Sequence, residues 1–482
     1  MQQYLDTFQH LAQQYLQQQR PASSPIDAQQ VKQSIDLSLG AVGSELEDLK
    51  QAASHYLKLQ PDSGQVDFFK LLYSGRNHPA LLGDWVASLS NANMHTFQVS
   101  PVATLMELEL IKQWNQLVGF TNDTQNGDGV MVPGGSQANL IAMMMARHRA
   151  VPDIKTKGIV NRTLVAYVSD QAHYSSLKAA NILGIGTDNL VPVASDSQGR
   201  LCPLALTQAI KKSLSEGKTP FFIGLTAGTT VIGAFDPVPE CRAIADQYKL
   251  WLHIDGAWGA PVLFSPQHRH LLKGSELADS FAWDAHKLMN VPITAAVILT
   301  RHQGMLEQTC GGGGADYLFH GDENAAYNLG QKSIQCGRRA DALKVWLSWK
   351  AVGSNGYSNK VNHLQTLKQV CVDRIEASDQ LHLIGPTPYL NILFQFRPPM
   401  QQPTADDQWL NEDSLRELNI ALCKRMQTHG CAYVDYAKYQ GKTGIRLILA
   451  NGDTQLEDIQ RLINHCLEFG NQLIDARPSA NP

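Results

Sequence analysis

Short, nearly continuous apolar runs begin at about residue 128 and recur along the chain, separated by longer amphipathic stretches. The seven clearest runs are residues 130–132, 164–168, 190–193, 221–225, 250–254, 281–283 and 295–299. A strand that is covered on both faces has this unbroken apolar character, whereas a half-exposed strand alternates. Several stretches between the runs have helical composition, namely 138–149, 174–183, 204–215 and 239–248. The alternation predicts an α/β domain built on a mainly parallel sheet.

The regions on either side of this alternation have other patterns. The first 77 residues are Gln-rich and helical in character, without a strand signal. Residues 361–482 alternate helical patterns with short apolar runs such as 389–396 and 444–449, which is typical of a smaller α+β domain. We therefore expect a helical N-terminal segment (1–77), a large domain (78–360) and a small C-terminal domain (361–482). Four consecutive glycines at 311–314 predict a mobile segment across 303–332.

Charge and composition narrow the function classes. Lys plus Arg is 40 and Asp plus Glu is 44, so the formal charge is 40 − 44 = −4. Without a run of five like charges, no nucleic-acid partner is expected. The 43% of hydrophobic residues can form a sizeable core, but the apolar runs are too short to span a bilayer. The eight cysteines include no CxxC pair, which indicates no metal site and favours a reducing cytoplasm.

A glycine-rich segment and an acidic residue lie at the ends of two predicted strands. The sequence Pro-Gly-Gly-Ser at 133–136 follows a strand and opens a helix, where free N–H groups and the helix dipole favour a phosphate. An ordinary tight glycine turn explains this segment equally well. Asp255 ends a buried strand, the place where open α/β sheets bind ligands. A helix N-cap or a core ion pair is the alternative for this carboxylate.

Lys287 and His173 follow two other predicted strands. A lysine among apolar neighbours at a strand end can form a Schiff base, although most lysines simply lie at the surface. The ring of His173 can stack on a planar cofactor, although taken alone it is more simply a capping or core histidine. Together, a phosphate cradle, a strand-end acid, an aromatic ring and a nucleophilic lysine are the parts that hold pyridoxal 5'-phosphate.

The order and wording of these motifs resemble the group II pyridoxal-phosphate decarboxylases, which act on glutamate, cysteine sulfinate, aspartate, aromatic amino acids and 2,4-diaminobutyrate. The resemblance runs from about His78 to Asn451. Its most specific segments are SPVATLME at 100–107, TAGTT at 226–230, HIDGAWG at 253–259, HK at 286–287 and QCGRR at 335–339. The resemblance implies a fold type I large domain, pyridoxal phosphate as the cofactor, and a homodimer that shares its active sites.

The resemblance also assigns the cofactor contacts by motif. Lys287 would hold the cofactor covalently, Asp255 would pair with its ring nitrogen, and His173 would stack on its ring. The phosphate would be contacted by Gly135, Ser136 and His286. The ring would be lined by Thr230 and Ala257. One departure from the family is Asp284-Ala285, where the family has Asn-Pro before the His-Lys pair.

A substrate arginine and a proton donor follow from the same resemblance. Arg446 matches the family arginine that binds the α-carboxylate of the substrate. In the family a tyrosine on a mobile loop donates or relays the proton that replaces CO₂. Here that loop would be 308–330, with Tyr327 as the candidate and Tyr317 as the alternative.

The expected substrate is a small L-amino acid with an acidic side chain: aspartate, glutamate or cysteine sulfinate. Asn93 and His95 match family substrate contacts, and an amide with an imidazole that can become cationic suits an acid. Diaminobutyrate is the runner-up, because Asp84 can pair an ammonium group if it reaches the pocket. The remaining alternatives are an aromatic amino acid decarboxylase and a catalytically inactive relative with a regulatory role, against which the presence of Lys287 and Asp255 argues.

Overall fold

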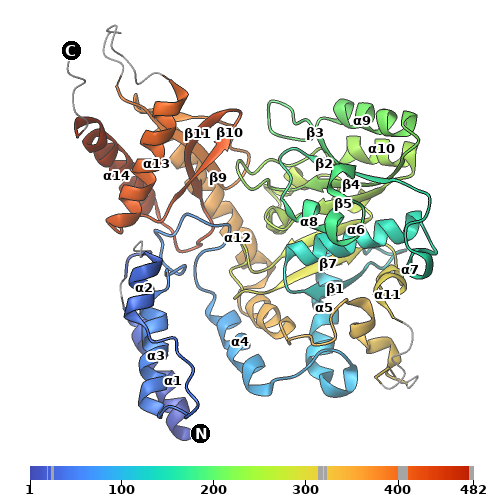
Figure 1. Ribbon diagram of the computed structural model, residues 1–482, viewed down its shortest axis with the longest axis horizontal. Helices are drawn as coiled ribbons and strands as arrows, with labels where there is room; N and C mark the ends of the chain where they lie inside the picture. The colour runs from blue at the N-terminus through green and yellow to red at the C-terminus, as the bar shows by residue number, and fades with distance from the viewer. Residues whose placement is uncertain (19, 23–26, 313–317, 320–322, 400–410, 477–482) are drawn as a thin grey trace.

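The computed structural model describes residues 1–476 apart from 19, 23–26, 313–317, 320–322 and 400–410. Figure 1 shows three parts: N-terminal helices in blue, a large sheet with helices around it, and a smaller sheet with orange and red helices. A long helix, α12 (Ala342–Glu376), connects the two sheets in the chain. The predicted α/β architecture is confirmed.

The large sheet has seven strands in the order β1-β7-β6-β5-β4-β2-β3. The five neighbours from β6 to β3 are parallel, whereas β7 is antiparallel to both β6 and β1. The link between β6 and β7, residues 285–295, contains no helix that could carry the chain back for a parallel strand. Each predicted run forms one strand: β1 (Asp128–Val132), β2 (Leu164–Ser169), β3 (Leu190–Val193), β4 (Thr219–Thr226), β5 (Trp251–Asp255), β6 (Ser280–Asp284) and β7 (Ala296–Thr300).

Helices cover both faces of this sheet, which explains the unbroken apolar runs. Along β2, Leu164, Ala166 and Val168 belong to one hydrophobic core, and Val165 and Tyr167 belong to the other. The first core includes residues of α6 (Gly135–Ala150) and α8 (Ser175–Ile182), and the second includes residues of α5 (Pro101–Val118), α9 (Pro203–Ser215) and α10 (Val238–Tyr248). Further helices complete this part: α4 (His78–Ser90), α7 (Ile154–Lys157), α11 (Met305–Cys310), η1 (Phe97–Val99), η2 (Thr187–Asn189), η3 (Ala260–Phe264), η4 (Arg269–Leu272), η5 (Ser275–Leu277), η6 (Ala325–Tyr327) and η7 (Leu329–Lys332).

The small sheet is antiparallel, with the order β10-β11-β9-β8. The predicted runs 389–396 and 444–449 correspond to two of its strands, β9 and β11. The apolar pattern does not predict β10, because this edge strand reads Asp-Tyr-Ala-Lys-Tyr and is only partly buried. The elements here are β8 (Leu381–Leu383), β9 (Asn391–Phe396), α13 (Glu412–Thr428), β10 (Asp435–Tyr439), β11 (Lys442–Ile448) and α14 (Leu456–Asp475).

Three helices form the N-terminal part: α1 (Gln2–Gln17), α2 (Ala28–Ser34) and α3 (Leu46–Leu59). The domain limit placed at 77 precedes the first residue of α4, whereas the limit placed at 360 falls inside α12, so these limits stay a prediction. α12 is bent at Gly353, whose φ of 65° is not helical. Within the described ranges, no helix is both long and apolar enough to cross a membrane.

Asp279, just before β6, is a buried carboxylate with four donors. One oxygen accepts from His302 Nε2 at 2.7 Å and Arg149 at 3.3 Å, and the other accepts from Arg242 at 3.0 Å and the backbone N–H of Leu252 at 2.8 Å. Burial alone would raise the pKa of Asp279, but these hydrogen bonds and positive charges outweigh it and lower the pKa to about 2. The folded protein therefore favours the ionised form.

We expect Asp279→Asn to lower the free energy of unfolding by about 2 kcal/mol at pH 7. Because the folded-state pKa lies below the unfolded value, this contribution is present above about pH 4 and is lost as the pH falls toward 2. Urea denaturation of both proteins at pH 7 and at pH 2.5 measures this contribution to the free energy of unfolding. Asp246→Asn is the control, since this exposed partner of Arg242 should contribute little. An equal loss of stability at pH 7 and pH 2.5 would contradict the assignment.

Candidate active site

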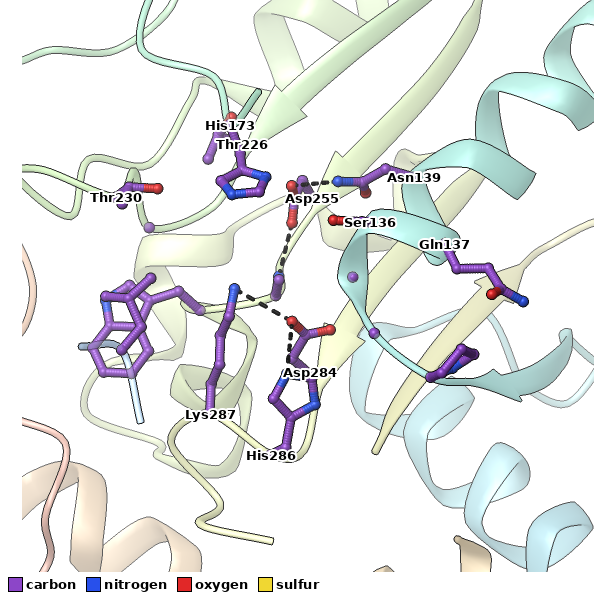
Figure 2. Close-up of a pocket in the computed structure, with 17 residues that line it drawn as sticks. Ser136, Gln137, Asn139, His173, Thr226, Thr230, Asp255, Asp284, His286 and Lys287 are labelled. Carbon is purple, nitrogen blue, oxygen red and sulfur yellow. Dashed lines mark hydrogen bonds and ion pairs between the residues drawn. The ribbon is translucent and has the colours of Figure 1, made fainter. Parts of the chain in front are cut away.

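A cavity of about 390 Å³ opens at the carboxyl ends of β4, β5 and β6, beside the N-terminus of α6. This is the edge at which open α/β sheets bind their ligands. Figure 2 shows side chains from these elements around one space. All the residues expected to contact a cofactor line it: Gly135, Ser136, His173, Thr230, Asp255, Ala257, His286 and Lys287.

The first turn of α6 forms the part of the cavity that suits a phosphate. The first N–H groups of a helix lack intrahelical partners, and the helix dipole adds partial positive charge there. Gly135 approaches β6 so closely that a Cβ atom would lie 2.9 Å from both carboxylate oxygens of Asp284, so only glycine fits. His286 lies beside the turn that precedes α6, since its Cε1 would be 4.0 Å from a Cβ atom at Gly134, and its Nε2 is 3.5 Å from Asp284 Oδ2. An anion with several oxygen atoms can be held between these groups.

Lys287 projects into the cavity from the turn after β6. Its backbone N–H bonds to the carbonyl of Asp284 at 3.2 Å, and its Nζ lies 3.3 Å from Asp284 Oδ2. The carboxylate is buried, and its Oδ1 has no hydrogen-bond partner among the described residues. The ion pair fixes Nζ in the cavity, where a primary amine can attack a carbonyl group.

Asp255 is the last residue of β5 and is partly buried. Its Oδ2 accepts from Nδ2 of Asn139 at 2.7 Å, and its Oδ1 accepts from the backbone N–H of Ala257 at 3.1 Å. Each oxygen keeps acceptor capacity, since an ionised carboxylate offers about four lone-pair sites. A carboxylate in this setting is stabilised by a positively charged N–H group.

His173 lies at the cavity with a neutral ring. Burial lowers its pKa, the carboxylate of Asp255 opposes this effect, and the charge of Lys287 adds to it. The backbone N–H of Ser175 donates to Nδ1 at 3.3 Å, so the neutral ring carries its hydrogen on Nε2. A neutral aromatic face can stack on a planar ligand ring.

Arg446 does not line the cavity but is fixed next to Thr230, which does. It lies in β11, and its guanidinium donates to the carbonyl of Thr230 at 3.2 Å and to that of Lys70 at 2.8 Å. Its Nε is buried without a hydrogen-bond partner among the described residues. The two carbonyl contacts hold the guanidinium beside Thr230 of the cavity wall.

Asn93, His95 and Tyr327 do not line the cavity. The side chain of Asn93 and the carbonyl of His95 accept backbone N–H groups of the segment 325–339, to which Tyr327 belongs. The Tyr327 ring is 5.3 Å from that of Phe97. The Tyr327 side chain is well exposed. Tyr317 lies outside the described residues.

Four polar residues of the cavity are absent from the sequence-based set: Gln137, Asn139, Thr226 and Asp284. Asn139 lies three residues after Ser136, a spacing that places both on one side of a helix. Asp284 is the last residue of β6 and contacts both His286 and Lys287. The helical spacing is the signal that could have indicated Asn139, and the strand-end position could have indicated Asp284.

The arrangement fits pyridoxal phosphate on the chemistry of its donor set. An amine that can attack an aldehyde, a carboxylate that can pair with a protonated ring nitrogen, a neutral ring and an anion-binding helix start surround one cavity. Gly135 lets the first turn of α6 lie close to Asp284, where a Cβ atom would meet the carboxylate. Among the residues that the structure describes, no group of His, Cys, Asp and Glu is placed to hold a metal ion.

Comparison with known proteins agrees with this chemistry. Residues 28–397 match the family described as the pyridoxal-dependent decarboxylase conserved domain. The chain is 34% identical to the acidic amino acid decarboxylase GADL1 of Bos taurus, over 90% of this chain and 84% of that protein. It is also 34% identical to the cysteine sulfinic acid decarboxylase of Homo sapiens, over 93% of this chain and 90% of that protein.

Solved structures show the same fold. A crystal structure of mouse CSAD in its apo form superposes with a TM-score of 0.88 at 32% identity, covering 94% of each chain. The structure of Oryza sativa TDC with PLP and tryptamine, at 21% identity and a TM-score of 0.87, shares the fold. The chain therefore belongs to the pyridoxal-dependent decarboxylase family, as an enzyme that uses pyridoxal phosphate.

Proposed function

We propose that this enzyme removes CO₂ from a small L-amino acid with an acidic side chain, such as aspartate, glutamate or cysteine sulfinate. The observation that carries the reaction is the convergence of Lys287 and Asp255 on one cavity with the phosphate-binding start of α6. The substrate class is supported by relatives that are named for acidic amino acids and for cysteine sulfinic acid.

The residues of this chain divide the work of the reaction. Bound pyridoxal phosphate supplies an electron sink for the electron pair that departing CO₂ leaves behind. Lys287 holds the cofactor covalently through Nζ, and Asp255 keeps a proton on the ring nitrogen, which makes the ring a better electron acceptor. Gly135, Ser136 and His286 bind the phosphate.

Other residues are assigned to the ring of the cofactor and to the substrate. His173, Thr230 and Ala257 line the cofactor ring, and His173 contributes a neutral aromatic face. Arg446 binds the α-carboxylate through its guanidinium, which already spans the Thr230 and Lys70 carbonyls. Such a contact orients the bond to be broken and thereby lowers the barrier without a chemical step of its own.

A second copy of the chain completes the site in this proposal. Asn93, His95 and Tyr327 do not line the cavity of their own chain, and they would reach the cavity of a partner, where Tyr327 would deliver a proton. Exposed apolar side chains on α4, η1 and α5 support a homodimer: Leu82, Trp85, Val86, Leu89, Val99, Val102 and Leu105. A solution mass equal to that of one chain would contradict it.

Diaminobutyrate is less well supported. Asp84, the residue proposed to pair its ammonium group, does not line the cavity. Its Oδ1 lies 3.1 Å from Arg339 and 3.5 Å from Lys344, so its charge is already matched within the chain.

We also place the enzyme in the cytoplasm, since its eight free cysteines suit a reducing compartment; fractionation of cells tests this.

A panel of amino acids assayed for CO₂ release tests the function. We expect release from at least one of aspartate, glutamate and cysteine sulfinate, and at least tenfold lower kcat/KM with diaminobutyrate and tyrosine. The amine product is measured beside CO₂, because transfer of the amino group to a keto acid would indicate transamination instead. Release from diaminobutyrate or tyrosine alone would contradict the acidic substrate.

A further inference from the structure

Behind Asp255, polar side chains form a line through an otherwise apolar core. Trp251, His253 and Asp255 are alternate residues of β5 and therefore point to the same face of the sheet. Ser280 of β6 is the cross-strand partner of His253. Asn139 comes from α6, which covers this face.

These five residues are joined by four hydrogen bonds. Trp251 Nε1 and Ser280 Oγ are 2.8 Å apart, Ser280 Oγ and His253 Nδ1 are 2.9 Å apart, and His253 Nε2 and Asn139 Oδ1 are 2.9 Å apart. Asn139 Nδ2 then donates to Asp255 Oδ2 at 2.7 Å. We call this set the Asp255 hydrogen-bond chain. Its first four members are buried, so water does not substitute for any link.

The carboxylate at one end fixes the direction of every link. An ionised carboxylate only accepts, so Asn139 must turn its NH₂ group toward Asp255 and its oxygen toward His253. His253 must then carry its hydrogen on Nε2, which leaves Nδ1 as an acceptor for the hydroxyl of Ser280. The indole N–H of Trp251 can only donate, and it donates to Ser280. All four donors therefore point toward Asp255.

The Asp255 hydrogen-bond chain gives Asp255 a hydrogen-bond donor but no positively charged partner. Burial lowers the pKa of His253 to about 4, with Asp255 opposing the shift, so its imidazole is neutral at pH 7. Facing groups are neutral as well: the ring of Phe222 stacks on His253, and the groups bonded to its nitrogens are a hydroxyl and an amide. A cationic histidine would itself interact with the negative charge of Asp255 and so weaken the pairing of Asp255 with a cationic group of the ligand. A neutral histidine does not weaken that pairing.

We propose that His253 is a positioning residue: its Nε2–H holds the oxygen of the Asn139 amide in place, so that the NH₂ group of Asn139 stays on Asp255 and aims this carboxylate at the ring nitrogen of the cofactor. This inference rests on the proposed pairing of Asp255 with that nitrogen. Aligned hydrogen bonds also strengthen one another in a low-dielectric interior, which makes the Asn139 donor stronger.

Cofactor binding to His253→Leu and His253→Gln tests the proposal. The probes are pyridoxal 5'-phosphate and its 1-deaza analogue, in which C–H replaces the ring nitrogen. We expect His253→Leu to weaken pyridoxal phosphate binding about tenfold and to leave the analogue within about twofold of wild type. His253→Gln keeps an N–H near the Nε2 position and should recover most of the loss. An equal loss with both probes in both variants would show a packing role and overturn the proposal.

A measurement on the unsubstituted holoenzyme needs no variant to fold. Nitrogen NMR of ¹⁵N-histidine-labelled protein should show His253 with hydrogen on Nε2 and a bare Nδ1 from pH 6 to 8, and hydrogen on Nδ1 would overturn the proposal. The pairing of Asp255 with the ring nitrogen and the positioning role of His253 are contradicted by different results. Equal wild-type affinity for the two probes contradicts the pairing of Asp255, whereas a wild-type preference for pyridoxal phosphate that His253→Leu leaves unchanged overturns only the role of His253.

Discussion

Lys287→Ala should lower kcat by about 10³-fold or more, because the only amine that lines the cavity among the described residues is removed. Asp284 then loses its cationic neighbour at 3.3 Å, and the phosphate contacts of α6 are left to hold the cofactor without a covalent bond. The measurement is twofold: turnover with the best acidic substrate, and the cofactor that stays attached after borohydride treatment. The first should fall and the second should disappear.

Lys178→Ala is the matched control for this experiment. Lys178 lies near the same site, over the ring of Tyr174, but does not line the cavity. Its variant should keep covalent trapping and nearly all activity. Trapping that persists at full yield in Lys287→Ala would show that another lysine holds the cofactor, and the mechanism would have to be rebuilt around that residue.

Asp255→Asn should produce the second-largest loss, about 10²-fold to 10³-fold in kcat/KM, since truncating one partner of a partly buried charge pair costs about 2–5 kcal/mol. The amide keeps the size of the side chain but removes the negative charge that holds a proton on the ring nitrogen. Cofactor affinity should weaken together with kcat, and fluorescence titration of the apoenzyme measures the affinity directly.

Asp170→Asn is the comparison, because Asp170 also follows a strand of the large sheet, β2, but lies outside the cavity. Its carboxylate accepts from the backbone N–H of Ser195 and from the side chain of Gln171. Little change in activity is expected there. If both variants lost activity equally, the effect of Asp255 would reflect general charge in the sheet and not a specific contact.

Much of the fold can be predicted from the sequence because the large sheet is covered on both faces. Each of its strands is an unbroken apolar run, and Lys287, Asp255 and His173 each occur at or just after the end of one. Since parallel strand ends meet at one edge, local pattern places all three residues at the same edge of the sheet. Their convergence on one cavity depends also on the strand order, which the pattern does not give. The antiparallel direction of β7 does not follow, because it depends on the path of a loop without helix.

The remaining parts of the site depend on contacts that local pattern does not contain. Asn139 reaches Asp255 only because α6 packs across β5, and Asp284 matters only because Gly135 lies against it. The family resemblance, not periodicity, singles out Arg446. Asn93, His95 and Tyr327 do not line the cavity of their own chain, so the roles expected of them from the family resemblance would require the proposed second subunit.

Thr230 joins the two sheets and thereby affects how the protein unfolds. Its side chain lines the cavity of the large sheet, while its carbonyl accepts from Asn391 of β9 at 3.0 Å and from Arg446 of β11 at 3.2 Å. Asn391 in turn accepts from the indole of Trp258, another cavity residue. We therefore expect a cofactor that binds only the native state to stabilise the small sheet too, so that both sheets unfold in one transition.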